Sequence, residues 1–160
     1  MTDTKNTLVP AILRVGFIIG VLDATSAMIH GYALRRTTPD RIWKYVASGA
    51  FGPDANKGGA EMIIAGLLFH FFIATCWTGL FFILAGQLEA LRRYKIPAGI
   101  AYGLFVWLAM NFVVVPLSRI GPFPIRLNTP TILQIMIHLL VIGLPISLLA
   151  NSYYEATSRT

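Results

Sequence analysis

Six polar or ionisable side chains interrupt long apolar stretches of this sequence and are the candidates for chemistry. They are Asp23, His30, His70, Asn111, Gln134 and His138. An ionisable group near the centre of a bilayer costs at least about 2.5 to 3.5 kcal/mol on insertion scales, so it usually faces other helices or a cavity. A carboxylate in such surroundings must either pair with an imidazolium or stay protonated. We therefore predict that Asp23 is a protonatable centre, with His70 and His138 as its partners and His30 as a gate.

The depth of four of these residues predicts a common layer. The four are Asp23, His70, Asn111 and His138. Counted from the ends of the apolar stretches nearest the first and third loops, each lies roughly 8 to 11 residues deep, or about 12 to 16 Å at about 1.5 Å per residue. Gly20 shares a helical face with Asp23, and small residues let a neighbouring backbone approach closely. The sequence thus predicts a buried polar layer to which four helices contribute.

Each of these side chains also has a purely structural interpretation. Polar side chains that hydrogen-bond across helices stabilise membrane bundles by roughly 0.6 to 2 kcal/mol each. Asn111 and Gln134 fit this interpretation better than a functional one, whereas Asp23 is balanced between the two. His70 and His138 fit donation of a ring proton to a carbonyl or to Asp23 better than ligation. No metal or cofactor is therefore predicted, and haem with His70 and His138 as axial ligands is the less favoured alternative.

The residues need helices that cross a membrane to position them, and the composition favours such helices. The chain has 160 residues, of which 56% are hydrophobic and 12% are charged, and its mean hydropathy is +0.67. These values lie well outside the range of soluble globular domains. We predict an all-α membrane protein, a bundle of four transmembrane helices that forms one domain over residues 1–160. The apolar stretches long enough to cross about 30 Å of hydrocarbon are residues 11–34, 60–86, 98–118 and 131–151.

The loops contain further local signals. A short helix lying on the membrane surface is predicted over about residues 39–48, because Pro39 follows two threonines in a typical capping sequence. Trp43 and Tyr45 supply the aromatic side chains of an interfacial helix. Good helix formers after the second span predict that this helix continues to Lys95.

The net charge of +6 is concentrated at the ends of the apolar stretches, as in Arg35 and Arg36 and in Arg92, Arg93 and Lys95. Anchoring to lipid headgroups explains this distribution better than binding to nucleic acid. The expected partners are therefore the lipid bilayer and, in a homo-oligomer, further copies of the chain, with no nucleic acid. The second of these clusters lies beside two spans and favours cytoplasmic termini, although the opposite side carries a similar number of basic residues.

Several enzyme signatures are missing from the sequence. Cys76 is the single cysteine, and there is no glycine-rich phosphate loop and no serine or cysteine with an evident partner base. An enzyme is therefore less favoured than a non-enzyme. The first hypothesis is handling of protons, ions or a small polar ligand by the Asp23, His70 and His138 layer. The alternative is a structural or partner-binding membrane subunit in which this layer only fixes the helix register.

Six short motifs distributed along nearly the whole chain carry a family resemblance. They are GVLD at 20–23, ASGAFG at 47–52, GLLFH at 66–70, WLAMN at 107–111, VPLS at 115–118 and GLPIS at 143–147. In these motifs the chain resembles small uncharacterised bacterial multipass inner-membrane proteins and, more distantly, the YagU-like proteins. The resemblance implies a location in the bacterial inner (plasma) membrane, and it implies no activity and no site residues.

Overall fold

Four long apolar helices form the fold, which the computed structural model describes for residues 4–158, with side chains from residue 7 onward. The first two spans are α1 (Thr4–Arg35) and α3 (Ala60–Gln87). The third consists of α5 (Lys95–Ala109), the π-helical segment η2 (Met110–Val114) and α6 (Val115–Leu117), and the fourth of α7 (Thr129–Ile137), the π-helical segment η3 (His138–Gly143) and α8 (Leu144–Thr157). Each span is long and apolar enough to cross a membrane. The prediction of an all-α membrane protein with four spanning helices is confirmed.

Large apolar side chains cover the outside of the spans. Phe17, Leu68 and Phe72 are 62%, 67% and 67% exposed, respectively. Contiguous apolar surface of this kind is unfavourable in water and favourable in hydrocarbon. Because the helices satisfy their own backbone hydrogen bonds, these positions suit direct contact with lipid.

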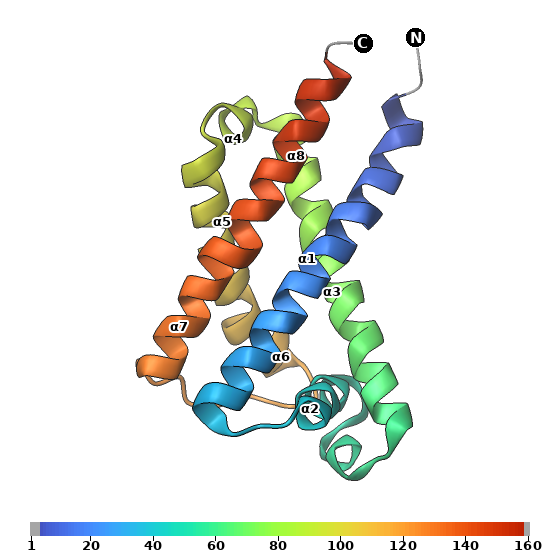
Figure 1. Cartoon of the computed structure of the whole chain (residues 1–160), viewed down its shortest axis with the longest axis vertical. Helices are drawn as coiled ribbons and strands as arrows, with labels where there is room; N and C mark the ends of the chain where they lie inside the picture. Colours follow the sequence, from blue (N-terminus) through green and yellow to red (C-terminus); the bar gives the residue numbers. More distant parts are fainter. Residues whose placement is uncertain (1–3, 159–160) are drawn as a thin grey trace.

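The hydrophobic core lies in the half of the bundle nearest the two chain ends (Figure 1). The largest fully buried apolar side chains are Ile19 of α1, Phe81 and Phe82 of α3, and Ile146 of α8. The ring of Tyr102 from α5 packs edge to face on Phe81, with 4.8 Å between the ring centroids. All four spans therefore meet in this half, and apolar packing closes it.

The opposite end of the bundle is covered by α2 (Pro39–Phe51) and the 3₁₀ turn η1 (Pro53–Lys57), which lie across the ends of the spans (Figure 1). The short helix predicted over residues 39–48 is therefore present and slightly longer, and its place on the membrane surface stays a prediction. It packs closely on α3, because a Cβ atom at Gly66 would overlap the carbonyl oxygen of Trp43. This contact fixes α2 against the bundle.

The prediction that the second span continues to Lys95 is wrong, because α3 ends at Gln87 and a separate short helix, α4 (Glu89–Arg93), follows. The guanidinium of Arg92 folds back and donates to the carbonyl of Ala85 at 2.6 Å. It thereby satisfies a carbonyl near the end of α3, where the helix leaves the last carbonyls without backbone partners. The side chain expected to extend the helix therefore helps to terminate it.

Two spans extend further than the apolar pattern predicts. α1 begins at Thr4 with Pro10 inside it, and α8 ends at Thr157. The hydroxyl groups of Thr7 and Tyr153 lie 3.0 Å apart and form a hydrogen bond that joins the two extensions. Polar contacts of this kind continue the helices where hydrocarbon is no longer the solvent.

We expect Gly66→Ala to destabilise the protein by about 1 to 3 kcal/mol, because the added methyl group forces α2 away from α3. Gly79→Ala on the same helix is the matched control, since its Cβ would meet only the Ile12 side chain at 3.5 Å. The control should be neutral or more stable by up to about 1 kcal/mol. Denaturant unfolding of the detergent-solubilised protein measures both. Equal stability of the two variants would contradict the close contact.

Candidate functional site

The six predicted residues line two adjoining chambers in the half of the bundle nearest α2. The larger chamber, of about 650 Å³, is lined by Asp23, His70, Asn111, Gln134 and His138 among others. The smaller chamber, of about 420 Å³, is lined by Asp23, His30, Gln134 and His138 among others. The two chambers share the wall formed by Asp23, Gln134 and His138, and we call them together the cavity. The structure thus brings all six residues to one space, while their functional roles stay predictions.

Asp23 and His70 are neighbours in the wall of the larger chamber. Oδ2 of Asp23 lies 3.9 Å from Nδ1 of His70, and the two side chains are 28% and 11% exposed. Nε2 of His70 lies 2.9 Å from the Gly20 carbonyl oxygen, which can only accept, so Nε2 carries a proton. The facing atoms then have two complementary forms, a carboxylic acid facing neutral imidazole or a carboxylate facing imidazolium. Both forms contain one proton between the two groups and have no net charge.

His138 and Asn111 bind carbonyls of their own helices and leave their other polar atoms available. Nδ1 of His138 lies 2.9 Å from the Gln134 carbonyl oxygen, and the amide of Asn111 donates to the Trp107 carbonyl at 2.8 Å. Asp23 lies within electrostatic range of His138. Nε2 of His138 and the side-chain amide of Gln134 make no hydrogen bond with the described part of the chain. These free groups give the shared wall both donors and acceptors.

His30 joins α1 to the start of the fourth span. Its Nε2 lies 2.9 Å from the carbonyl oxygen of Pro130, which again accepts. Because Pro130 lies in the first turn of α7, the bond ties the two helices together beside the smaller chamber. His30 is therefore part of the wall in this structure, and a gating role stays a prediction.

Two π-helical segments place Asn111 and His138. Each segment ends two residues before a proline, Pro116 after η2 and Pro145 after η3. A proline inside a helix lacks an N–H, and its ring conflicts with the carbonyl four residues earlier, so a wider turn before it relieves both problems. π segments of this kind are frequent at functional sites. Because both prolines lie within predicted spans, they are the sequence signal from which these turns could have been predicted.

Glycine brings α5 against the second of these widened turns. A Cβ at Gly103 would overlap the carbonyl oxygen of His138, and one at Gly143 would overlap the backbone of Gly99 and Gly103. Only glycine allows this distance between two backbones. The position of His138 is therefore fixed by backbone contact and not by its side chain alone.

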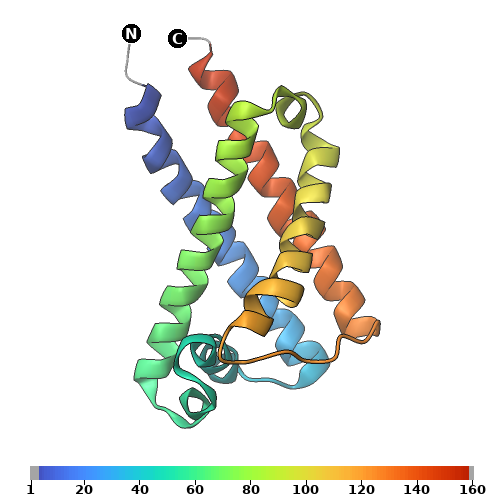
Figure 2. The same cartoon turned by 180° about the vertical axis from the view of Figure 1, so that it is seen from behind.

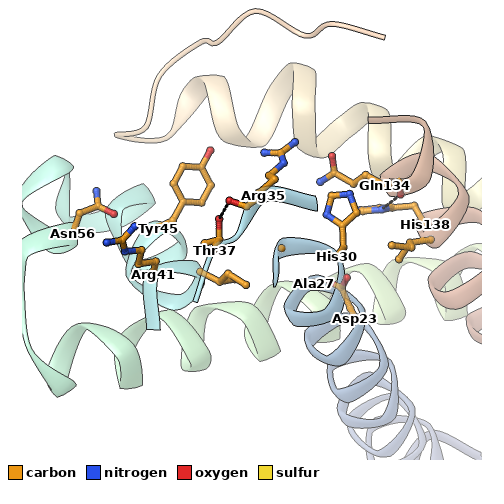
Figure 3. A pocket seen from close by; sticks show the side chains of 13 residues that line it. Asp23, Ala27, His30, Arg35, Thr37, Arg41, Tyr45, Asn56, Gln134 and His138 are labelled. Atoms are coloured by element: carbon orange, nitrogen blue, oxygen red, sulfur yellow. Dashed lines mark hydrogen bonds between the residues drawn. The ribbon is translucent and has the colours of Figure 1, made fainter. Parts of the chain in front are cut away.

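The mouth of the smaller chamber is built by residues from the first loop that sequence reasoning did not select. They are Thr37, Arg41, Tyr45 and Asn56, together with Arg35 at the end of α1. Figure 3 shows Arg41, Tyr45 and Asn56 on one side, His30 and His138 on the other, and Arg35 between them. Burial raises the pKa of Tyr45, while the positive charge of Arg35 acts in the opposite direction. The phenol is thus a neutral hydrogen-bonding group at neutral pH.

The rest of the larger chamber is apolar and reaches the outside of the bundle. Its walls include Phe72 and Trp77 from α3 and Met110 and Val114 from η2. Nε1 of Trp77 lies 3.3 Å from the sulfur of Met110, which links the two walls. This part of the chamber is lined by α3 and by the third span, which run side by side in Figure 2, and Phe72 in its wall is 67% exposed.

No protein-family model, curated protein or solved structure significantly matches the chain. The resemblance to YagU-like inner-membrane proteins therefore stays a prediction.

Metal and haem binding depend on the same histidines. Within residues 4–158, no three His, Cys, Asp or Glu side chains lie close enough to hold a metal ion. Nδ1 of His70 and Nε2 of His138 make no hydrogen bond with the described chain, as is also true of Nδ1 of His30, so haem ligation by His70 and His138 stays an alternative prediction. A Soret band in protein purified with haem available is the measurement that decides it.

We expect the neutral histidines to adopt opposite tautomers, Nε2–H in His30 and His70 and Nδ1–H in His138, because each donates to a carbonyl oxygen. Nitrogen-15 spectra of the histidine-labelled protein measure this directly, and replacement of each histidine by glutamine assigns its signals. In Asp23→Asn, His70 should remain Nε2–H. An Nε2–H signal from neutral His138 would show that its bond to the Gln134 carbonyl is absent.

Proposed function

We propose that this membrane protein binds a small amphipathic molecule in the cavity, with the polar end of the molecule against the wall of Asp23, Gln134 and His138. One observation carries the proposal: residues from all four spans combine free polar groups and a continuous apolar wall in one space. The volume of the larger chamber, about 650 Å³, lies within the usual range of small-molecule sites, roughly 300 to 1,000 Å³. Placed polar groups in an apolar pocket are the typical composition of such sites.

The shape of the cavity favours binding over conduction. The polar side chains lie in the half of the bundle nearest α2, and the core around Ile19, Phe81 and Ile146 fills the other half. A path for ions or protons across the membrane needs polar groups or water along its whole length. The apolar core interrupts such a path, so the cavity is a half-membrane-deep chamber with one closed end.

Asp23 and His70 provide the proton-handling part of this proposal. A ligand that donates a hydrogen bond to Asp23 stabilises the carboxylate and the imidazolium of His70. A ligand that accepts from Asp23 stabilises the carboxylic acid and neutral imidazole. The two groups lie 3.9 Å apart, so the proton passes between them when the side chains approach by about 1 Å or when one water molecule bridges them. The pair therefore adapts to both kinds of polar group without a change in net charge.

For the cellular setting we propose the bacterial inner membrane with cytoplasmic termini. Arg92, Arg93 and Lys95 form a basic cluster next to two spans on the side of the termini, which supports this orientation. In that orientation the mouth of the smaller chamber faces the periplasm. The exposed apolar surface of the spans leaves room for lipid or for a second copy of the chain.

Quenching of tryptophan fluorescence by bromine-tipped amphiphiles tests the proposal. We expect Trp77, which lines the larger chamber, to be quenched saturably by at least one of three probes with the same undecyl chain: the carboxylate, the alcohol and the trimethylammonium. Val114→Phe fills the chamber and should weaken this apparent affinity about tenfold or more. The measurement is made in phosphatidylcholine nanodiscs, with Trp77→Phe identifying the signal.

Val113→Phe is the matched control, because Val113 is 51% exposed and does not line the cavity. It should bind the probes as the native chain does. Quenching that never saturates and is equal in the native chain and both variants would mean partition into lipid alone. That result would exclude the proposed function.

A further inference from the structure

The mouth of the smaller chamber contains two arginines without acidic partners. Arg35 and Arg41 line it, and neither forms an ion pair within the part of the chain that the structure describes. The carboxylates of the first loop are engaged by lysines, Asp40 by Lys44 at 3.9 Å and Asp54 by Lys57 at 2.9 Å. The two guanidinium groups are therefore available to a ligand.

The charge balance of this chamber favours an anion. Asp23 is its single lining carboxylate, against the two arginines, and Tyr45 stays a neutral phenol. When the carboxyl group of Asp23 is ionised and His70 is neutral, the lining side chains carry a net charge of one positive unit. When the carboxyl is protonated, or when it is paired with an imidazolium, the positive excess is larger. A cationic group meets repulsion in each of these states, whereas a carboxylate or phosphate matches the guanidinium geometry.

The larger chamber indicates that the rest of the ligand is an alkyl chain. Phe72 in its apolar wall is 67% exposed and lies about 18 Å along α3 from Ala60 at about 1.5 Å per residue. This depth corresponds to hydrocarbon and not to headgroups. Arg35 and Arg41 lie near the other end of the cavity, at the level of the first loop, where headgroups are found.

We propose that the ligand is a single-chain acidic amphiphile dissolved in the membrane, which enters between α3 and the third span. Its anionic group occupies the smaller chamber, which Arg35 and Arg41 line together with the wall of Asp23, Gln134 and His138. This inference rests on the proposed function and adds the ligand's charge, its route and its orientation. The anion then lies at headgroup depth and the chain extends into the larger chamber, which is the orientation that such a molecule already has in a bilayer.

The three bromine-tipped probes distinguish the ligand classes. We expect the carboxylate to bind about tenfold more tightly than the alcohol or the trimethylammonium in phosphatidylcholine nanodiscs. Arg35→Gln and Arg41→Gln should each weaken binding of the carboxylate about fivefold to tenfold and leave the alcohol unchanged. Arg36→Gln is the matched control, because Arg36 adjoins Arg35 in the chain and does not line the cavity.

A charge reversal keeps the test decisive if one glutamine variant folds poorly. Arg41→Glu should shift the preference toward the trimethylammonium probe, since it replaces a positive charge of the chamber with a negative one. Circular dichroism identifies variants that keep the native helix content. Unchanged binding of the carboxylate in the folded arginine variants would show that these residues only anchor the protein to headgroups, and would overturn the inference.

The remaining outcomes separate this inference from the proposed function. If all three probes bind equally and Val114→Phe abolishes their binding, the cavity remains a binding site, but the inference that its ligand is acidic is overturned. If sodium butyrate displaces the carboxylate probe at equal concentration, the ligand is a free anion, and the inference that it is an amphiphile is overturned. If the quenching is the same in Val114→Phe as in the native chain, the proposed function itself is excluded.

Discussion

Close contact through glycine sets the spacing of the helices and hence the size of the cavity. A Cβ at Gly16 would collide with Thr75, and one at Gly20 would collide with Phe71, so α1 and α3 form one tight pair. Gly103 of α5 is equally close to the backbone of η3 and creates a second pair. By contrast, the backbones of α3 and α5 stay apart, and side chains such as Tyr102 on Phe81 bridge these two helices. The larger chamber is the space between the two pairs, and its shape depends on backbone approach at these glycines more than on the residues that line it.

Prolines then place polar side chains beside that space. Hydrocarbon offers no partner to a backbone carbonyl, so each widened turn must satisfy its carbonyls internally. Asn111 and His138 lie at the start of the turns that precede Pro116 and Pro145, and each donates to a carbonyl of the preceding α-helix four residues earlier. Each side chain has further polar atoms that this bond does not use. The same residues can therefore stabilise an interrupted helix and contact a ligand, so the structural and functional interpretations of these polar groups are compatible.

The sequence predicts the features that depend on local residue patterns. It predicts fewer of the features that depend on how distant segments pack together. Hydropathy alone predicts the four spans, and equal depth in the spans was sufficient to select Asp23 and the other lining residues of the polar layer. Arg41 and Tyr45 were missed as cavity residues because their position depends on how α2 docks at Gly66, which is a contact between segments distant in sequence. The end of α3 was missed because it is capped by Arg92, a residue that follows the end of the helix. Helix propensity takes no account of the hydrogen bond from its side chain to the Ala85 carbonyl.

The single closed end of the cavity also limits what the Asp23 and His70 pair can accomplish. A proton that moves between them stays within one chamber, and exchange with water has to occur through the mouth beside Arg35 and Tyr45. The core around Phe81 and Ile146 separates the pair from the side of the termini. Ligand binding can therefore be linked to proton uptake or release on one side of the membrane only. Transfer to the other side would require the two tight helix pairs to separate at the core. There Tyr102 of one pair packs on Phe81 of the other, and the Tyr154 hydroxyl donates to the Phe82 carbonyl, so side-chain contacts between the pairs oppose that movement.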